Sequence, residues 1–314
     1  MANNTAYTYT VRAINSEDDF ISSYNEEGWS LLYLDSPVIN SVASKADGLK
    51  ITWGAVEGAV NYKVYKRVNN AWVALGYSST NSFTDTDVIS GNTYLYTVRC
   101  VTEDSKTLLS HHTTGKSGRF VASPEISKIE NTATGSKITW SAVTGAQKYK
   151  VFVKAENGWK VIATTTATSF TYAPLTNNKN YTYTVRACNN NGDFVSDYNK
   201  EGKSNTFLSV PVLKSVESVE NGLKISFNKV TGAENYRVYV KSGSSWKGIG
   251  NTTSTSFIDE SVKSGSTYTY TVRCVSEDGK TVKSYFNTKG ISKTFVATPK
   301  ITKAENTQNG TKVT

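Results

Sequence analysis

The stretch Tyr94-Leu95-Tyr96-Thr97-Val98-Arg99 decides the fold, because it recurs along the chain almost unchanged. Its copies begin at Tyr7, Tyr181 and Tyr268, so successive copies start 87 residues apart. Apolar and polar side chains alternate within it, which is typical of a β-strand with one buried face. The period is longer than that of a solenoid repeat and close to the size of a small domain. The sequence therefore predicts a row of separate, similar β-domains.

Other landmarks keep nearly the same spacing and divide the chain into units. A proline opens each unit, and an aromatic residue follows 16 residues after each of the first three prolines. These residues are Pro37, Pro124, Pro211 and Pro299, and Trp53, Trp140 and Phe227. They predict three complete units at 37–123, 124–210 and 211–298, here named units 1, 2 and 3. Residues 1–36 match the C-terminal half of a unit and 299–314 the start of another, so we expect a stretch of a longer array.

A second pattern groups the units in pairs. Arg12-Ala13-Ile14-Asn15 resembles Arg186-Ala187-Cys188-Asn189, whereas Arg99-Cys100-Val101-Thr102 resembles Arg273-Cys274-Val275-Ser276. The first copy thus resembles the third, and the second resembles the fourth. This alternation indicates that the element duplicated during evolution was a pair of domains.

The composition predicts an all-β chain of tandem antiparallel sandwiches. The chain is rich in β-branched and aromatic residues, and nothing in it has the pattern of a long helix. No stretch approaches the roughly 20 apolar residues of a membrane span. Turn residues separate short alternating runs at the spacing of a seven-stranded sandwich. In unit 1 we expect strands near 38–44, 49–54, 61–67, 71–77, 80–84, 93–102 and 106–120, the last broken at Gly115.

These residues carry a family resemblance. Unit 1 resembles a fibronectin type III domain through the following positions, which recur in units 2 and 3: Pro37, Trp53, Tyr62, Val64, Val88, Tyr94, Tyr96, Val98 and Cys100. The resemblance implies a three-plus-four-stranded sandwich of the immunoglobulin-like kind. It also implies that Tyr94, Tyr181 and Tyr268 form the tyrosine corner, with the hydroxyl bonded to backbone near the preceding turn. Phe227 in place of Trp, and the absence of the usual proline from that turn, depart from the family pattern.

Each complete unit contains one cysteine, so no unit can close an internal disulfide and each depends on its apolar core. Cys100 and Cys274 have the inward parity of their strands and are expected in the core. Cys188 is one residue out of register and falls at the outer edge of its strand, where an exposed thiol able to link chains is one option; its reactivity stays open.

The inventory of reactive groups indicates no enzyme. The chain has two histidines, the neighbours His111 and His112, which point to opposite faces of a strand and cannot bind one metal together. No catalytic triad, phosphate loop or paired-cysteine motif occurs, so we predict no catalytic, metal or cofactor site. The formal net charge is +9, but the lysines alternate along strands as solvent-facing residues do, so nucleic acid is not an expected partner.

One set of aromatic residues forms a candidate ligand-binding site. An outward-facing aromatic residue on the third strand and a tryptophan on the fourth recur in each unit: Tyr65 and Trp72, Phe152 and Trp159, and Tyr239 and Trp246. Such pairs can stack on sugar rings or anchor protein contacts. They can equally cover the sheet as framework, and both interpretations stay open.

The joints between units favour a mechanical role. Val121-Ala122-Ser123 runs directly into Pro124 without a Gly/Ser linker, and the other joints are alike. Strands of eight to ten residues make each unit roughly 30 Å long, so three units form a rod on the order of 100 Å. We therefore expect an extracellular, semi-rigid stalk of a bacterial surface or secreted protein, whose lysine-, threonine- and asparagine-rich style of fibronectin type III repeat this chain resembles. The alternative is an adhesin whose repeats bind a host glycoprotein, an immunoglobulin or a polysaccharide; head-to-tail self-assembly is a third, weaker option.

Overall fold

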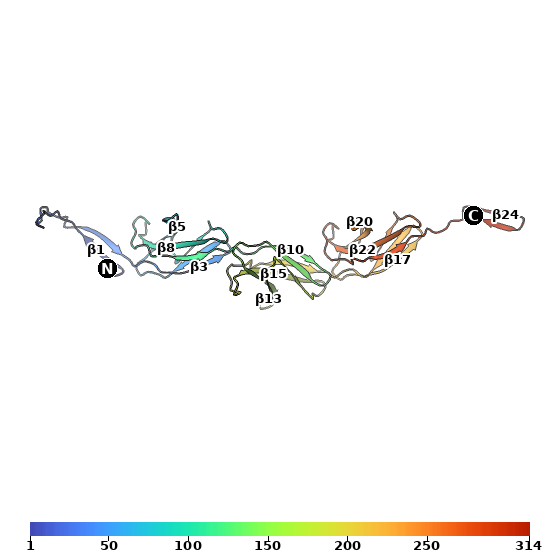
Figure 1. Ribbon diagram of the computed structural model, residues 1–314, viewed down its shortest axis with the longest axis horizontal. Helices are drawn as coiled ribbons and strands as arrows, with labels where there is room; N and C mark the ends of the chain where they lie inside the picture. The colour runs from blue at the N-terminus through green and yellow to red at the C-terminus, as the bar shows by residue number, and fades with distance from the viewer.

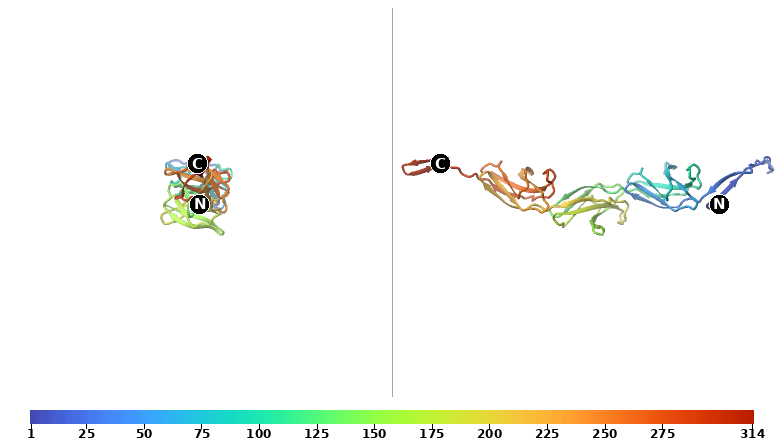
Figure 2. Two further views of the ribbon diagram at one scale, coloured as in Figure 1. Left: turned by 90° about the vertical axis from the view of Figure 1, so that its right-hand side faces the viewer. Right: turned by 180° about the vertical axis from the view of Figure 1, so that it is seen from behind.

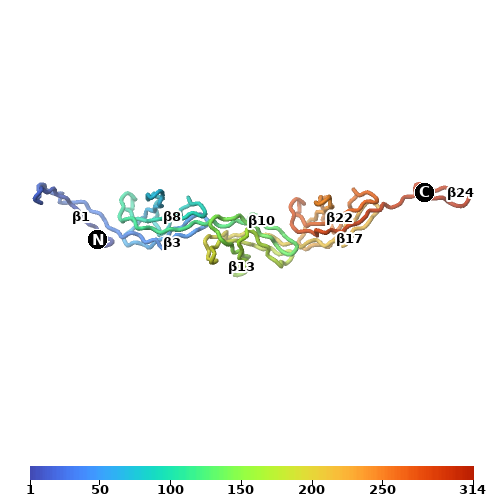
Figure 3. The backbone as a smooth tube through the Cα atoms, in the orientation of Figure 1, coloured from blue at the N-terminus to red at the C-terminus, as the bar shows by residue number.

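The computed structural model describes all 314 residues as an elongated chain of β-sandwiches (Figure 1). Units 1, 2 and 3 follow one another along the long axis, with the termini near opposite ends (Figure 3). Units 1 and 3 lie on the same side of this axis and unit 2 on the other, as the view along the axis shows (Figure 2). None of the elements is a helix with the length and apolar character that a membrane crossing requires.

Unit 1 contains two antiparallel sheets. The smaller has the strand order β3-β4-β7 and the larger the order β6-β5-β8-β9. Its strands are β3 (Ile39–Lys45), β4 (Gly48–Trp53), β5 (Asn61–Val68), β6 (Ala71–Ser78), β7 (Ser82–Asp85), β8 (Thr93–Val101) and β9 (Lys116–Arg119). The chain changes sheet after β4, β6 and β7, so the two sheets are interleaved in sequence and enclose one core.

Units 2 and 3 repeat this topology. In unit 2 the strands are β10 (Ile126–Asn131), β11 (Ser136–Trp140), β12 (Lys148–Ala155), β13 (Gly158–Thr165), β14 (Ser169–Tyr172), β15 (Lys179–Cys188) and β16 (Lys203–Phe207). In unit 3 they are β17 (Leu213–Val219), β18 (Gly222–Phe227), β19 (Asn235–Ser242), β20 (Ser245–Thr252), β21 (Ser256–Asp259), β22 (Thr267–Val275) and β23 (Ile291–Thr294). The remaining strands form two hairpins, β1 (Thr5–Tyr9) with β2 (Trp29–Tyr33), and β24 (Ala304–Thr307) with β25 (Gly310–Val313).

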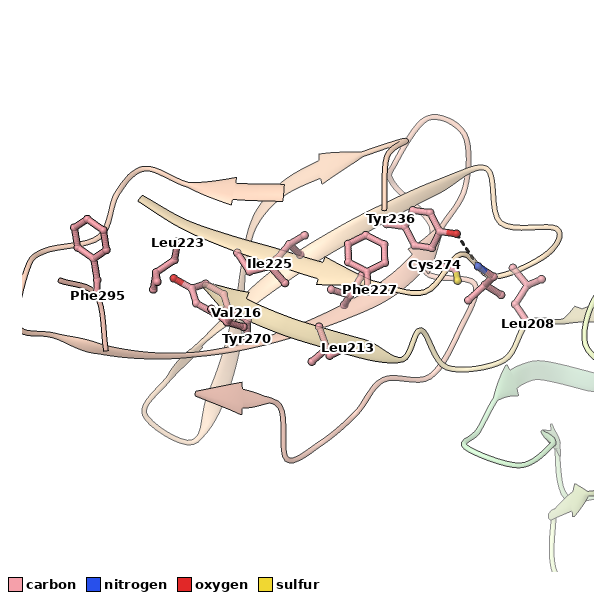
Figure 4. Packing of buried hydrophobic residues seen from close by; sticks show 13 residues of the cluster. Leu208, Leu213, Val216, Leu223, Ile225, Phe227, Tyr236, Tyr270, Cys274 and Phe295 are labelled. Atoms are coloured by element: carbon pink, nitrogen blue, oxygen red, sulfur yellow. Dashed lines mark hydrogen bonds between the residues drawn. The ribbon is translucent and has the colours of Figure 1, made fainter. Parts of the chain in front are cut away.

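The core of each unit lies between its two sheets, where the inward side chains meet. In unit 3, thirteen buried residues pack together, and Phe227 is only 1% exposed (Figure 4). Trp53 and Trp140 hold the same position in the other units and are also buried. The replacement of tryptophan by phenylalanine therefore keeps an aromatic ring at the centre of the core.

The tyrosine corner implied by the family resemblance is confirmed in every unit. The backbone N–H groups of Ile89, Thr176 and Lys263 donate hydrogen bonds of 2.8, 3.0 and 2.9 Å to the tyrosine hydroxyls. The accepting residues are Tyr94, Tyr181 and Tyr268. Each bond fixes the start of a long central strand against the turn before it.

Six of the seven strands expected in unit 1 are confirmed to within two residues, and the expectation for the last is wrong. The expected break at Gly115 is confirmed, because a strand begins at Lys116, but of residues 106–120 only Lys116–Arg119 form a strand. Residues 102–115 form a loop, here called the return loop, which folds back beside the end of β8. The ladder is interrupted because the Ser110 hydroxyl, and not a backbone carbonyl, accepts the Cys100 N–H at 2.8 Å.

The option that Cys188 is an exposed thiol is wrong, because Cys188 is fully buried. It holds the position of Val101 and Val275, which are buried as well. In each unit the return loop folds back and pairs with this residue, Phe194 pairing with Cys188 in unit 2. An outward-facing position at the end of the strand is therefore covered by the loop.

We expect all three cysteines to be unreactive in the folded chain. Burial raises the pKa of the Cys100 and Cys274 thiols to about 11 and also raises that of Cys188. Only about one thiol in a thousand with a pKa of 11 is ionised at pH 8, and the thiolate is the reactive form. A colorimetric thiol reagent at pH 8 should detect almost no reaction before urea is added and three thiols per chain afterwards. Rapid reaction of one thiol in the native chain would contradict this.

Unit 1 contains a buried ion pair that the other units lack. The Lys66 ammonium lies 2.9 Å from Asp85 Oδ2, with side chains 9% and 3% exposed. The Tyr96 hydroxyl donates to the same carboxylate at 2.8 Å, and its pKa is raised by burial and by this hydrogen bond. In unit 3, Asp259 and Tyr270 make the same hydrogen bond at 2.8 Å, but Val240 replaces the lysine. The pair therefore offers an internal comparison between two units.

Candidate functional site

The six aromatic residues singled out from the sequence lie on the outer face of the larger sheets. Tyr65 and Phe152 are 8% and 9% exposed, whereas Tyr239 and the three tryptophans are partly buried. In unit 1, Trp72 pairs with Arg67 and not with Tyr65, which pairs with Ala74. The two aromatic residues of a unit thus lie diagonally on one face. Their role in ligand binding stays a prediction.

A third aromatic residue, supplied by the return loop, joins the pair in every unit. In unit 1 the His112 ring stacks on Trp72, with centroids 5.6 Å apart, and meets Tyr65 edge-on at 4.8 Å. Tyr198 and Phe286 occupy the same place beside Trp159 and Trp246, at 6.4 and 6.1 Å. The sequence aligns His112 with Tyr198 and Phe286, but sequence reasoning asked only whether histidine recurs there and so missed that all three residues carry an aromatic ring. Their common signal is a position two residues after a serine.

That serine and an arginine of the central strand hold the loop in place. The Arg99, Arg186 and Arg273 Nε atoms donate to the serine carbonyl at 2.6, 2.7 and 3.0 Å. The serine hydroxyl accepts the N–H of the residue after the arginine, at 2.8, 3.0 and 2.8 Å. The serines are Ser110, Ser196 and Ser284, each at most 4% exposed. The arginine that ends the repeated motif therefore positions the loop.

The tryptophans reach across the sheet to a glycine at the end of the return loop. A Cβ on Gly115, whose φ is +81°, would lie 3.1 Å from the Trp72 ring. The corresponding distances from Gly202 to Trp159 and from Gly290 to Trp246 are 2.7 and 2.9 Å. The threonines beneath the rings, among them Thr97 at 0% exposure, are sealed from water. The rings thus serve the framework in all three units. Unit 2 also has a pocket of about 150 Å³ here, lined by Phe152, Trp159, Thr184, Arg186, Phe194 and Tyr198.

No three His, Cys, Asp or Glu side chains come together in an arrangement that could hold a metal ion. The outer face offers aromatic rings and arginines, but these are the groups that hold the return loop. Another set of contacts recurs at equivalent positions of successive units, and it lies at the joints between them.

At each joint one apolar linker residue belongs to the core of the following unit. Leu34 packs in the core of unit 1, Val121 in that of unit 2 and Leu208 in that of unit 3, at 0%, 1% and 5% exposure. The residue before Val121, Phe120, packs in the core of unit 1 instead. Two consecutive residues are therefore anchored in different cores, which leaves the linker no free length.

A side-chain clasp spans the same joints. Asn3, Ser90 and Asn177 hold equivalent positions before a central strand, and each donates to a backbone carbonyl 54 residues further on. The acceptors are Glu57, Thr144 and Thr231, at 3.3, 2.8 and 2.9 Å. The same side chains accept a linker N–H, for example that of Ala122 at 3.0 Å from Ser90 Oγ. The clasp residue alternates between Asn and Ser, which follows the paired sequence pattern.

The turns that the Ser90 clasp joins, one in unit 1 and one in unit 2, are in close contact through their backbones. Gly91, with φ of +93°, follows Ser90, and a Cβ on it would lie 2.6 Å from Thr144 Cγ2. A Cβ on Gly145 of unit 2 would lie 3.2 Å from Gly91 Cα. Both positions have left-handed backbone, so glycine is required by conformation and by space. The joint is a packed interface that fixes how one unit meets the next.

No protein-family model matches the chain. Exoglucanase B of Cellulomonas fimi is 29% identical over 245 residues, which are 69% of this chain and 21% of that protein. Fibronectin type III domain-containing protein 7 of Mus musculus is 24% identical over 248 residues, 77% of this chain and 33% of that protein. The chain thus spans about a fifth and a third of the length of these curated relatives.

Two solved structures are also similar. The crystal structure of chicken CNTN1 FN1-FN3 domains covers 84% of this chain and 99% of its own, with 15% identity and a TM-score of 0.33. The structure of FN3tt mut covers 26% of this chain and 98% of its own, with 24% identity and a TM-score of 0.21.

Strand order, interleaved sheets and tyrosine corners together define the class of the three units as fibronectin type III-like β-sandwiches. The chain is an array of tandem fibronectin type III-like domains.

Proposed function

We propose that this chain is a semi-rigid spacer in an extracellular protein, and that the protein is a bacterial surface or secreted one. The observation that carries the proposal is the joint, because the joints before units 1, 2 and 3 each have both an apolar linker residue in the core of the following unit and a clasp at equivalent positions. Domains joined by flexible linkers move freely by default, so repeated packed joints favour a role that depends on fixed spacing.

The proposed spacer has no catalytic role of its own. The similarity to a fifth of Exoglucanase B supports the idea that an array of this kind can stand inside a larger protein with another activity. The larger protein would supply the activity or the anchor, and the array would set the distance between its parts.

Replacing the clasp residue should loosen one joint. Ser90→Ala removes one hydrogen bond to Thr144 and one from Ala122, worth about 0.5 to 1.5 kcal/mol each. With spin labels on cysteines placed at Lys106 and Glu201, exposed positions of units 1 and 2, the distance distribution from double electron–electron resonance should be narrow in the parent chain and broader in the variant.

Ser264→Ala is the matched control, because Ser264 holds the equivalent position in unit 3, at the joint that follows this unit, and bonds only the Ala297 N–H. It should leave the distribution between units 1 and 2 unchanged. A broad distribution of the distance between the spin labels in the parent chain would contradict the spacer proposal.

A further inference from the structure

A groove of about 650 Å³ lies at the joint between units 2 and 3. One wall consists of β10 and the start of β11 in unit 2, and the other of the return loop of unit 3, residues 276–290. Asn131 bridges the two walls, because its side-chain amide donates to the Lys283 carbonyl at 2.7 Å. The groove is therefore formed only when the two units meet as they do here.

The groove is positively charged. Lys128, Lys137, Arg273 and Lys283 line it, and Glu130 is the single acidic residue among the lining. Glu130 forms an ion pair of 2.7 Å with Lys128, so its charge is already matched. Burial lowers the pKa of the Arg273 guanidinium, which has lost part of its hydration. An anion in the groove would compensate the cations that remain.

A second groove, of about 380 Å³, lies at the joint between units 1 and 2 and uses the same elements. Lys45, Arg119 and Arg186 line it, without any acidic residue. Only Arg186 has a charged counterpart in the other groove, namely Arg273; the positions of Lys45 and Arg119 are threonines there. Apart from the equivalent Arg186 and Arg273, the positive charge is thus supplied by residues at different positions in the two grooves. Repetition of the sequence alone does not explain why both grooves are positively charged.

The remaining lining identifies the chemistry of the ligand. Ten of the fourteen residues around the larger groove are polar or charged, including the side-chain carbonyl of the Asn205 amide and the Thr281 hydroxyl. Amides and hydroxyls suit a ligand rich in hydroxyl groups. The rings of Tyr285 and Phe286 stand at one side, where the apolar face of a sugar can pack.

We propose that the grooves at the two joints bind a linear acidic polysaccharide, whose uronate carboxylates contact the lysines and arginines. This goes beyond the spacer role, since a spacer requires no ligand. Lysine is depleted at protein–protein interfaces, so the three lysines that line the larger groove favour a polysaccharide over an acidic protein segment.

The test uses the whole chain and oligomers of polygalacturonate, with calorimetry at low salt. The parent chain should bind the oligomers and fail to bind their methyl esters, which keep the backbone and lose the charge. Lys45→Gln/Lys137→Gln/Lys283→Gln should weaken binding roughly tenfold or more, because it removes cations from both grooves.

Lys154→Gln/Lys160→Gln/Lys247→Gln is the matched control, since it removes the same charge from exposed strand positions that line neither groove. It should change the affinity by less than about twofold. All variants should have the same melting temperature as the parent chain. Equal weakening in both triple variants, equal binding of the methyl esters, or no binding by the parent chain would each overturn the proposal. So would equally tight binding of poly-L-glutamate, which would indicate an acidic protein partner.

Discussion

Leu208→Ala is expected to lower the free energy of unfolding of unit 3 by about 2 to 5 kcal/mol, although Leu208 lies before the proline that opens that unit. Leu208 is 5% exposed and packs with the thirteen-residue core of unit 3 (Figure 4). Truncating a buried leucine removes its transfer free energy and leaves a cavity. Hydrogen exchange of unit 3 peptides in rising urea, followed by mass spectrometry, measures the loss in that unit alone.

Val296→Ala is the control for this experiment. Val296 holds the corresponding position after unit 3 and is 63% exposed, so its truncation should change stability by no more than about 0.5 kcal/mol. A loss of protection confined to unit 2 in Leu208→Ala would show that the linker leucine stabilises the preceding unit, contrary to the packing described.

Asp85→Asn should destabilise unit 1 by about 3 to 5 kcal/mol, because the buried Lys66 ammonium then keeps only the fully exposed Asp87 carboxylate, 3.8 Å away, as a counter-charge. The same substitution in unit 3, Asp259→Asn, disturbs only hydrogen bonds from Tyr270 and Ser261 and should cost about 1 to 3 kcal/mol. Urea unfolding, monitored by exchange in each unit, compares the two.

The double variant Lys66→Val/Asp85→Asn gives unit 1 the valine that unit 3 has at this position. It should be more stable than Asp85→Asn alone, because no buried charge is left uncompensated. Equal losses from Asp85→Asn and Asp259→Asn would show that the lysine contributes nothing to the effect.

The local structure was predictable from the sequence wherever a side chain faces the core. Trp53 and Tyr94 repeat at a fixed spacing because each copy of the fold needs the same shape at the same place. Strand alternation around them therefore located six strands of unit 1 to within two residues.

Contacts outside the core were not predictable in the same way. The alternation rule places Cys188 on the outward face of its strand, but it cannot show that the return loop covers that face. The aromatic residue of the loop can be aligned between units, but its contact with the tryptophan was not predictable, because His, Tyr and Phe share only a ring and the loop around it is irregular. The clasp joins Ser90 to Thr144, two polar loop residues whose pattern resembles that of any turn. Long-range pairing of polar side chains leaves no periodic signal in one sequence.

The opposite placement of successive units has a consequence for multivalent contact. Because β20 of unit 3 and its counterpart β13 of unit 2 lie on opposite sides of the axis, a flat partner lying along one side meets equivalent faces only at every second unit (Figure 1). Two such faces are held apart by an intervening unit whose joints are packed on both sides. An array of this kind would present equivalent faces at a fixed distance from one another. A bivalent partner would gain avidity only if its two binding sites were separated by that same distance.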